Sequence, residues 1–189
     1  MPIEATEVLS PEEYGRERES QNRAVIGVEK RRRVSTKTFT FLFENRDTVI
    51  NQINEMIFIE NIKDPEEVRY LINVYNDLMP SGDTLSVSMF IEISDPDVLL
   101  REMPRLSGIE NTVYLQFDGN EVKAIPEEGR STETLESTLQ YLKFRFTAED
   151  ATRFRSARNV FLETRHQNYS EAVRIPDSLK EDLSSEITV

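Results

Sequence analysis

The feature that most constrains the fold is an apolar residue at every second position between 85 and 93, with Phe90 as the one apolar residue among the intervening polar ones. The apolar residues at this spacing are Leu85, Val87, Met89, Ile91 and Ile93. Successive side chains of a β-strand point to opposite faces, so the pattern predicts a strand with one buried face. Similar apolar alternation over residues 39–43, 113–117 and 142–146 predicts further strands.

Three helices are expected before residue 80. Ser10-Pro11-Glu12-Glu13 combines a capping serine, a first-turn proline and a capping-box glutamate, and it predicts a helix that ends by about residue 33. The apolar stripe of this helix is poor, so we expect it to pack weakly. A second helix is expected over residues 45–62, and Asp64-Pro65 opens a third after a short link. The last two helices should form an αα-hairpin.

The order of these elements indicates an α+β fold. Short links separate the later strands, and Asp118-Gly119 is typical of a tight hairpin turn. We therefore predict a single domain with a mostly antiparallel sheet of about five strands packed with helices. The expected organisation is a flexible N-terminus over residues 1–9, one α+β domain over residues 10–189, and a polar surface loop near residues 126–138.

The chain is strongly acidic. Its 189 residues carry a formal net charge of −12. A protein that follows a nucleic-acid backbone needs a basic face, so this charge predicts no nucleic-acid partner. No stretch approaches the roughly 18 apolar residues of a membrane span, and residues 1–7 lack the basic start and apolar run of a signal peptide. We therefore expect a soluble, cytoplasmic protein without a membrane partner.

Cysteine is absent, and His166 is the single histidine of the sequence. The lack of cysteine excludes disulfides, thiolate zinc sites, cysteinyl iron–sulfur ligation and cysteine nucleophiles. One histidine excludes multi-histidine zinc sites and paired-histidine di-iron sites. The six glycines form neither a Walker loop nor a GxGxxG turn. We predict no cofactor and no metal site, although carboxylates leave a single hard cation such as Mg²⁺ open.

The helix expected over residues 45–62 carries charges in unusual places. At about 100° per residue, Arg46 and Glu60 fall on its main apolar face, where an unpaired charge would be costly. Glu55 lies among apolar residues on the opposite side, which predicts a partly buried carboxylate with a raised pKa, suited to a general base or a hard-metal ligand. We favour a structural alternative, in which these three residues and Glu44 form ion pairs at helix ends. Anion binding and catalysis stay open.

Two other groups could carry chemistry. Lys30-Arg31-Arg32-Arg33 places four cations in a row, where they favour a helix C-terminus by about 0.3–1 kcal/mol. They would instead clamp a phosphate or carboxylate if these arginines converged with Arg18 or Arg46 in one pocket. His166 could act as a general acid or base, although a lone histidine in a loop more often serves as a hydrogen-bonding or exposed residue.

A specific block of the sequence is Phe43-Glu44-Asn45-Arg46-Asp47-Thr48, followed by Gln52-Ile53 and Glu55-Met56. This block resembles the signature of a bacterial family known as domain of unknown function 3501. The similarity covers nearly the whole chain, and its other parts are Tyr14, Arg18, residues 30–34, Tyr75-Asn76-Asp77-Leu78-Met79-Pro80, residues 85–93, Tyr141-Leu142-Lys143-Phe144 and residues 166–169. Gln167 departs from the family, which usually has proline there.

The resemblance implies no assigned activity. It does imply genes placed beside those of rubrerythrin-like and iron–sulfur oxidoreductase proteins, and hence an accessory role in redox or oxidative-stress physiology. Our first hypothesis is a non-catalytic binding protein that docks such a redox partner through its acidic surface and residues 45–60. The alternative is an enzyme or small-anion-binding protein, and its candidate groups are Arg18, Arg32 and Arg46 as donors, Glu55 as base or metal ligand, and His166 as acid. The oligomeric state stays open.

Overall fold

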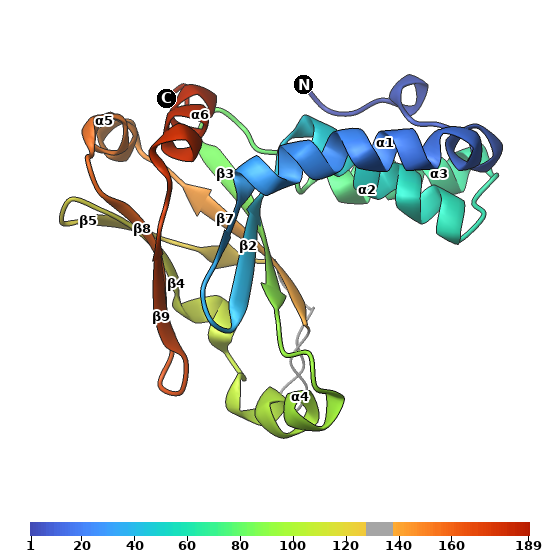
Figure 1. Ribbon diagram of the computed structural model, residues 1–189. Coiled ribbons are helices and arrows are strands. Elements are labelled where there is room, and N and C mark those ends of the chain that lie inside the picture. The colour runs from blue at the N-terminus through green and yellow to red at the C-terminus, as the bar shows by residue number, and fades with distance from the viewer. Residues whose placement is uncertain (128–137) are drawn as a thin grey trace. The chain divides into compact units, whose positions relative to one another are not determined.

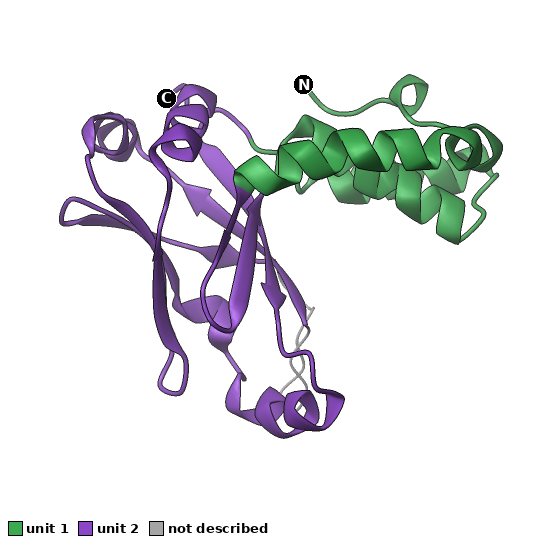
Figure 2. Ribbon diagram, in the orientation of Figure 1, with its two compact units in different colours: residues 1–32, 44–80 green, residues 33–43, 81–189 purple. Residues whose placement is uncertain are grey.

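The computed structural model describes residues 1–127 and 138–189, and the chain falls into two compact units. The first unit comprises residues 1–32 and 44–80, and the second comprises residues 33–43 and 81–189 (Figure 2). Because each unit is built from two separate stretches of chain, the sequence shows no simple boundary between them. The predicted α+β class is confirmed. The predicted surface loop near residues 126–138 lies almost entirely outside the described residues.

The first unit is built from helices (Figure 1). Its elements are the 3-10 helix η1 (Ala5–Glu7) and the α-helices α1 (Pro11–Arg32), α2 (Arg46–Ile59) and α3 (Pro65–Asn76). Helix α2 packs against both α1 and α3, so the predicted αα-hairpin is present. Helix α1 has the predicted length, whereas α2 ends three residues earlier than the sequence suggests, at Ile59.

Polar side chains define the beginning of each long helix in this unit. Before α1, the Ser10 hydroxyl accepts from the backbone N–H of Glu13 at 3.3 Å, and the Glu13 carboxylate accepts from the Ser10 N–H at 3.1 Å. Asn45 and Thr48 form the same reciprocal capping box at α2. Asp64 caps α3 in front of a first-turn proline. These caps satisfy N–H groups that the first helical turn leaves without a backbone partner.

The N-terminal segment, residues 1–9, makes specific contacts with α2 and α3. Ile3 is buried, and its N–H donates to Oδ1 of Asn76 at 2.7 Å while its carbonyl accepts from Nδ2 at 3.0 Å. The N–H of Leu9 donates to Oδ1 of Asn54 at 2.8 Å. The flexibility predicted for this segment stays a prediction, but these bonds would restrain it.

The second unit contains two antiparallel sheets. The first has the order β1-β2-β3-β7-β6, and its strands are β1 (Arg33–Ser35), β2 (Phe39–Phe43), β3 (Thr84–Ile91), β6 (Ile125–Pro126) and β7 (Leu139–Arg145). The second has the order β5-β4-β8-β9, and its strands are β4 (Val113–Phe117), β5 (Asn120–Lys123), β8 (Val160–Arg165) and β9 (Ser170–Arg174). The predicted sheet of about five strands is therefore present, together with a second sheet that the sequence pattern did not separate from it.

One continuous stretch of chain belongs to both sheets. Strand β5 pairs with β4, and after Ala124 the chain continues as β6, which pairs with β7. The predicted hairpin turn between β4 and β5 is confirmed, because Asp118 and Gly119 have φ angles of 44° and 86°. Glycine adopts such positive φ angles without steric cost.

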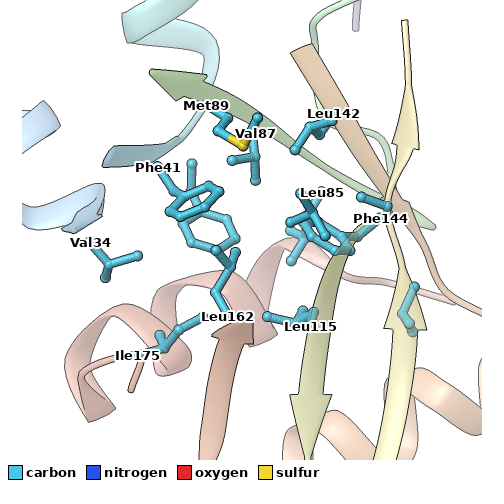
Figure 3. Close-up of a cluster of buried hydrophobic side chains, with 14 of the residues drawn as sticks. Val34, Phe41, Leu85, Val87, Met89, Leu115, Leu142, Phe144, Leu162 and Ile175 are labelled. Carbon is cyan, nitrogen blue, oxygen red and sulfur yellow. The ribbon is translucent and has the colours of Figure 1, made fainter. Parts of the chain in front are cut away.

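A large apolar core lies in the second unit. Side chains from both sheets point toward one another, including Phe41 of β2, Phe144 of β7 and Leu115 of β4 (Figure 3). The helices of this unit are α4 (Pro96–Glu102), η2 (Met103–Arg105), η3 (Ile109–Thr112), α5 (Ala148–Ser156) and α6 (Asp177–Glu186). Full burial of a large apolar side chain contributes about 1.5–3 kcal/mol relative to its exposed state, so this core dominates the stability of the unit.

Candidate functional site

The most extensively bonded of the predicted site residues lie between α1 and α2. Arg18 of α1 donates from Nε to Oε1 of Glu55 at 2.9 Å and from Nη2 to Oε2 at 2.9 Å. Two parallel bonds of this kind fix the orientation of both groups. The guanidinium also lies over the ring of Phe58, with Cζ 5.0 Å from the ring centre, which adds a cation–π contact. Arg18 and Glu55 thus converge, as the small-anion hypothesis requires of them.

Three uncharged side chains complete what we call the Arg18–Glu55 network. The hydroxyl oxygen of Tyr14 lies 2.9 Å from Oε1 of Glu55 and 2.9 Å from Oδ1 of Asn51, and Asn22 donates to Oε1 at 3.0 Å. The side chain of Tyr14 is fully buried, so its hydroxyl needs an acceptor. Burial and the hydrogen bond with Glu55 both raise the pKa of Tyr14.

The pKa of Glu55 moves in the opposite direction to the one predicted. The hydrogen bond from Arg18 lowers it most, partial burial opposes this, and the bonds from Asn22 and Tyr14 lower it further. The prediction of a raised pKa is wrong, because burial alone was considered and the donors were not. A carboxylate stabilised in its ionised form is a weak base, so this arrangement favours an ion pair over general-base catalysis.

Arg46 holds the N-terminal segment. Its Nη2 donates to both carboxylate oxygens of Glu7, at 2.5 and 2.6 Å, and its Nη1 donates to the carbonyl of Met1 at 2.7 Å. The hydrogen bond from Arg46 lowers the pKa of Glu7. The prediction that Glu60 lies on the core stripe is wrong, since α2 ends at Ile59 and Glu60 is its exposed C-cap.

Glu44 is buried immediately before α2. It accepts from the hydroxyl of Thr48 and from Nε2 of Gln52, the latter at 2.9 Å. Arg32, which is also buried, donates from Nη2 to the backbone carbonyl of Glu44 at 3.2 Å. Together with the capping by Asn45, these bonds show that the most specific sequence block builds the start of α2.

The four consecutive cations of residues 30–33 occupy different surroundings. Lys30 and Arg31 are exposed in the last turn of α1, where positive charge stabilises a helix end. Arg32 is the buried donor to Glu44. Arg33 begins β1 in the second unit, with Cζ 5.6 Å from the centre of the Phe90 ring.

His166 belongs to the second unit, whereas Glu55 belongs to the first. The His166 residue is 7% exposed, and its Nε2 lies 3.1 Å from the carbonyl oxygen of Ser107 while its Nδ1 lies 3.3 Å from the backbone nitrogen of Asn168. A backbone N–H can only donate, so Nδ1 is the acceptor and Nε2 carries the proton. The ring also stacks on Tyr169 at 6.2 Å between centres. His166 thereby ties the loop after β8 to the segment after η2.

Sequence reasoning missed the uncharged partners of these ions and the role of Glu7. A usable signal was present. Tyr14, Arg18 and Asn22 are four residues apart and share one face of α1, and Asn51 and Glu55 share one face of α2 in the same way. Matching polar stripes on two neighbouring helices indicate a polar helix interface.

Among residues 1–127 and 138–189, no three His, Asp or Glu side chains gather in a way that could hold a metal ion. In the same described ranges, no helix has the length and apolar character needed to cross a membrane. A single hard cation on fewer carboxylates stays a hypothesis.

The fold and the site define an α+β protein whose candidate site residues form ion pairs within the chain: Arg18 pairs with Glu55, and Arg46 pairs with Glu7. The family model described as a protein of unknown function (DUF3501) matches residues 2–187, so the chain belongs to that family, as the resemblance predicted. It is also similar to a crystal structure of a protein of unknown function from Burkholderia pseudomallei, with a TM-score of 0.90 and 28% identity over 99% of this chain and 100% of that one. No curated protein matches the chain.

Proposed function

We propose that this chain is a non-catalytic binding protein that serves a redox partner. One observation carries the proposal: charged residues that could have formed a catalytic pocket are bonded within the chain. Arg18 bonds to Glu55, and Arg46 bonds to Glu7. His166 of the second unit forms hydrogen bonds with the carbonyl of Ser107 and with the N–H of Asn168. Groups held in this way position helices and loops, which leaves surface recognition as the function that the geometry supports best.

The outer side of α3 supports the proposal. Tyr70 is 72% exposed and Val74, one turn later, is 38% exposed. Helical spacing places the exposed carboxylates of Glu66, Glu67 and Asp77 on the same side. This α3 face, defined by those five residues, complements a partner surface with an apolar anchor flanked by lysine or arginine. A symmetric contact with a second copy would bring like charges together, so a basic partner fits better.

The redox character of the partner rests on the gene neighbourhood that the family resemblance implies. The candidates are a rubrerythrin-like protein and an iron–sulfur protein encoded in the same genome. The absence of cysteine from this chain agrees with a division of labour, in which the partner and not this chain carries any thiolate-bound cluster.

Calorimetric titration of the purified chain with each purified candidate tests the proposal. We expect one candidate to bind at low salt and to bind more weakly at high salt. The double variant Tyr70→Ser and Val74→Ser should weaken binding by about tenfold or more. Leu100→Ser is the matched control, because Leu100 on α4 is 68% exposed. Failure of every candidate to bind at low salt would overturn the redox proposal, and equal binding by the double variant would overturn the role of the α3 face.

The alternative of an enzyme or small-anion-binding protein retains the convergence of Arg18 and Glu55. Against it, Arg18 is already neutralised by this carboxylate, and the lowered pKa of Glu55 makes that group a poor base.

A further inference from the structure

A pocket of about 420 Å³ lies in the first unit, between the N-terminal segment, the end of α2 and the start of α3. Its wall is largely apolar, and the side chains that matter here are Val8, Leu9, Ile57, Ile62 and Val68. Small-molecule sites in proteins typically enclose about 300–1,000 Å³ and combine apolar walls with a few polar groups. This N-terminal pocket fits that description, and the Arg18–Glu55 network does not line it.

The charged groups at the pocket favour an anion. Lys63 and Arg69 line it together with one carboxylate, that of Glu12. Lys63 pairs with Glu12 and Arg69 pairs with Glu66, and all four side chains are more than half exposed, so both ion pairs are weak. An ammonium group has three donors and a guanidinium has five. Within the described part of the chain, one carboxylate is bonded to each cation, so donors remain for a ligand.

We propose that the N-terminal pocket binds an amphiphilic carboxylate, with an unbranched aliphatic chain of medium length against the apolar wall and its carboxylate beside Lys63 and Arg69. Transfer of the chain from water to this wall provides the main driving force. The cations provide selectivity for a negative headgroup, on a protein whose net charge of −12 would otherwise repel an anion. This proposal does not rest on the redox-partner proposal, although Glu66 of the α3 face pairs with Arg69 at the pocket.

Three probes of equal chain length test the headgroup: octanoate, 1-octanol and octylammonium. Binding to the full chain is measured by calorimetric titration. Octanoate should bind saturably in the millimolar range or tighter, and about tenfold more tightly than octylammonium, which corresponds to about 1.4 kcal/mol. The proposal is overturned if octanoate does not bind saturably in that range, or if octylammonium binds equally well.

Variants test the position of the site. Val68→Trp places a bulky ring in the pocket and should weaken octanoate and octanol alike. The double variant Lys63→Gln and Arg69→Gln should remove the preference for octanoate over octylammonium. This double variant alone tests the site if circular dichroism shows that Val68→Trp does not fold. Arg23→Gln is the matched charge control, because Arg23 forms an exposed pair with Glu19 and does not line the pocket. Octanoate binding that is unchanged in the double variant would overturn the assignment to this pocket.

Discussion

In the second unit, Phe41, Leu115 and Phe144 are fully buried members of one apolar cluster to which both sheets contribute. In the first unit, the interface between α1 and α2 is centred on Tyr14 and on the ion pair of Arg18 with Glu55. Apolar contacts are non-directional, whereas hydrogen bonds require defined distances and angles. The contact between α1 and α2 should therefore respond to changes of pH and salt that leave the apolar core of the second unit unaffected.

The need for directional bonds accounts for Glu55 in the most specific block of the sequence. Helix α1 has a poor apolar stripe, so its position on α2 depends on directional bonds to named partners. Removal of one partner leaves the other without its bond, which costs more than the bond itself contributes. A structural role in holding α1 against α2 is therefore enough to explain these charged and polar residues, without a catalytic role.

The largest expected effect is loss of apolar packing in the second unit. Phe144→Ala should lower the free energy of unfolding by about 3–5 kcal/mol, because it removes a fully buried ring and leaves a cavity. Denaturant unfolding followed by circular dichroism measures the change. Leu100→Ala, at an exposed apolar site, should stay within about 0.5 kcal/mol of the wild type. A loss below about 1 kcal/mol for Phe144→Ala would contradict the description of this core.

A smaller loss is expected from the first unit. Tyr14→Phe keeps the ring against Phe58 but removes the buried hydroxyl, and should cost about 1–2 kcal/mol. Tyr70→Phe makes the same chemical change at an exposed position and should have almost no effect. Equal stability of the two variants would show that the hydroxyl of Tyr14 does not hold α1 to α2.

Acid should loosen the contact between α1 and α2 in the first unit. The pKa of Glu55 is lower in the folded than in the unfolded chain, so the ionised carboxylate stabilises the fold at a pH above the unfolded pKa. This contribution disappears as the pH falls through the folded pKa. Hydrogen exchange of α1 and α2 amides as a function of pH measures it, and Glu55→Gln should show a smaller pH dependence. An unchanged pH dependence in the variant would show that ionisation of Glu55 does not stabilise the contact between α1 and α2.

The smallest effect is expected at the N-terminal segment. Arg46→Met removes the bonds to Glu7 and to the carbonyl of Met1, and should speed hydrogen exchange at Ile3 and Leu9. The global free energy of unfolding should change by no more than about 1 kcal/mol, as for other partly exposed ion pairs. Arg23→Met is the control for loss of an exposed pair, and it should leave exchange at both amides unchanged.

Local signals in the sequence located helices of the first unit and strands of the second. Alternation predicted a strand over residues 85–93, and β3 covers Thr84–Ile91. The Ser10 capping box, the Asp64 cap and the Asp118-Gly119 turn are all present. These features depend on residues a few positions apart, so a pattern can reveal them.

Features that depend on distant residues were not predictable in the same way. Alternation identifies the buried face of a strand but not its pairing partner, so the division into two sheets was missed. Arg46 pairs with Glu7, which lies 39 positions earlier in the sequence, and no local pattern indicates that pair. For Glu55, burial and a nearby arginine shift the pKa in opposite directions, and only the bond from Arg18 decides the sign.

The most direct test of the central claim is an NMR titration of the Glu55 side-chain carboxyl in the intact chain. If the Arg18–Glu55 network holds the helices of the first unit together, the pKa will lie below the ordinary glutamate value and will rise in Arg18→Met. A pKa above the ordinary value would contradict this account and restore Glu55 as a candidate general base.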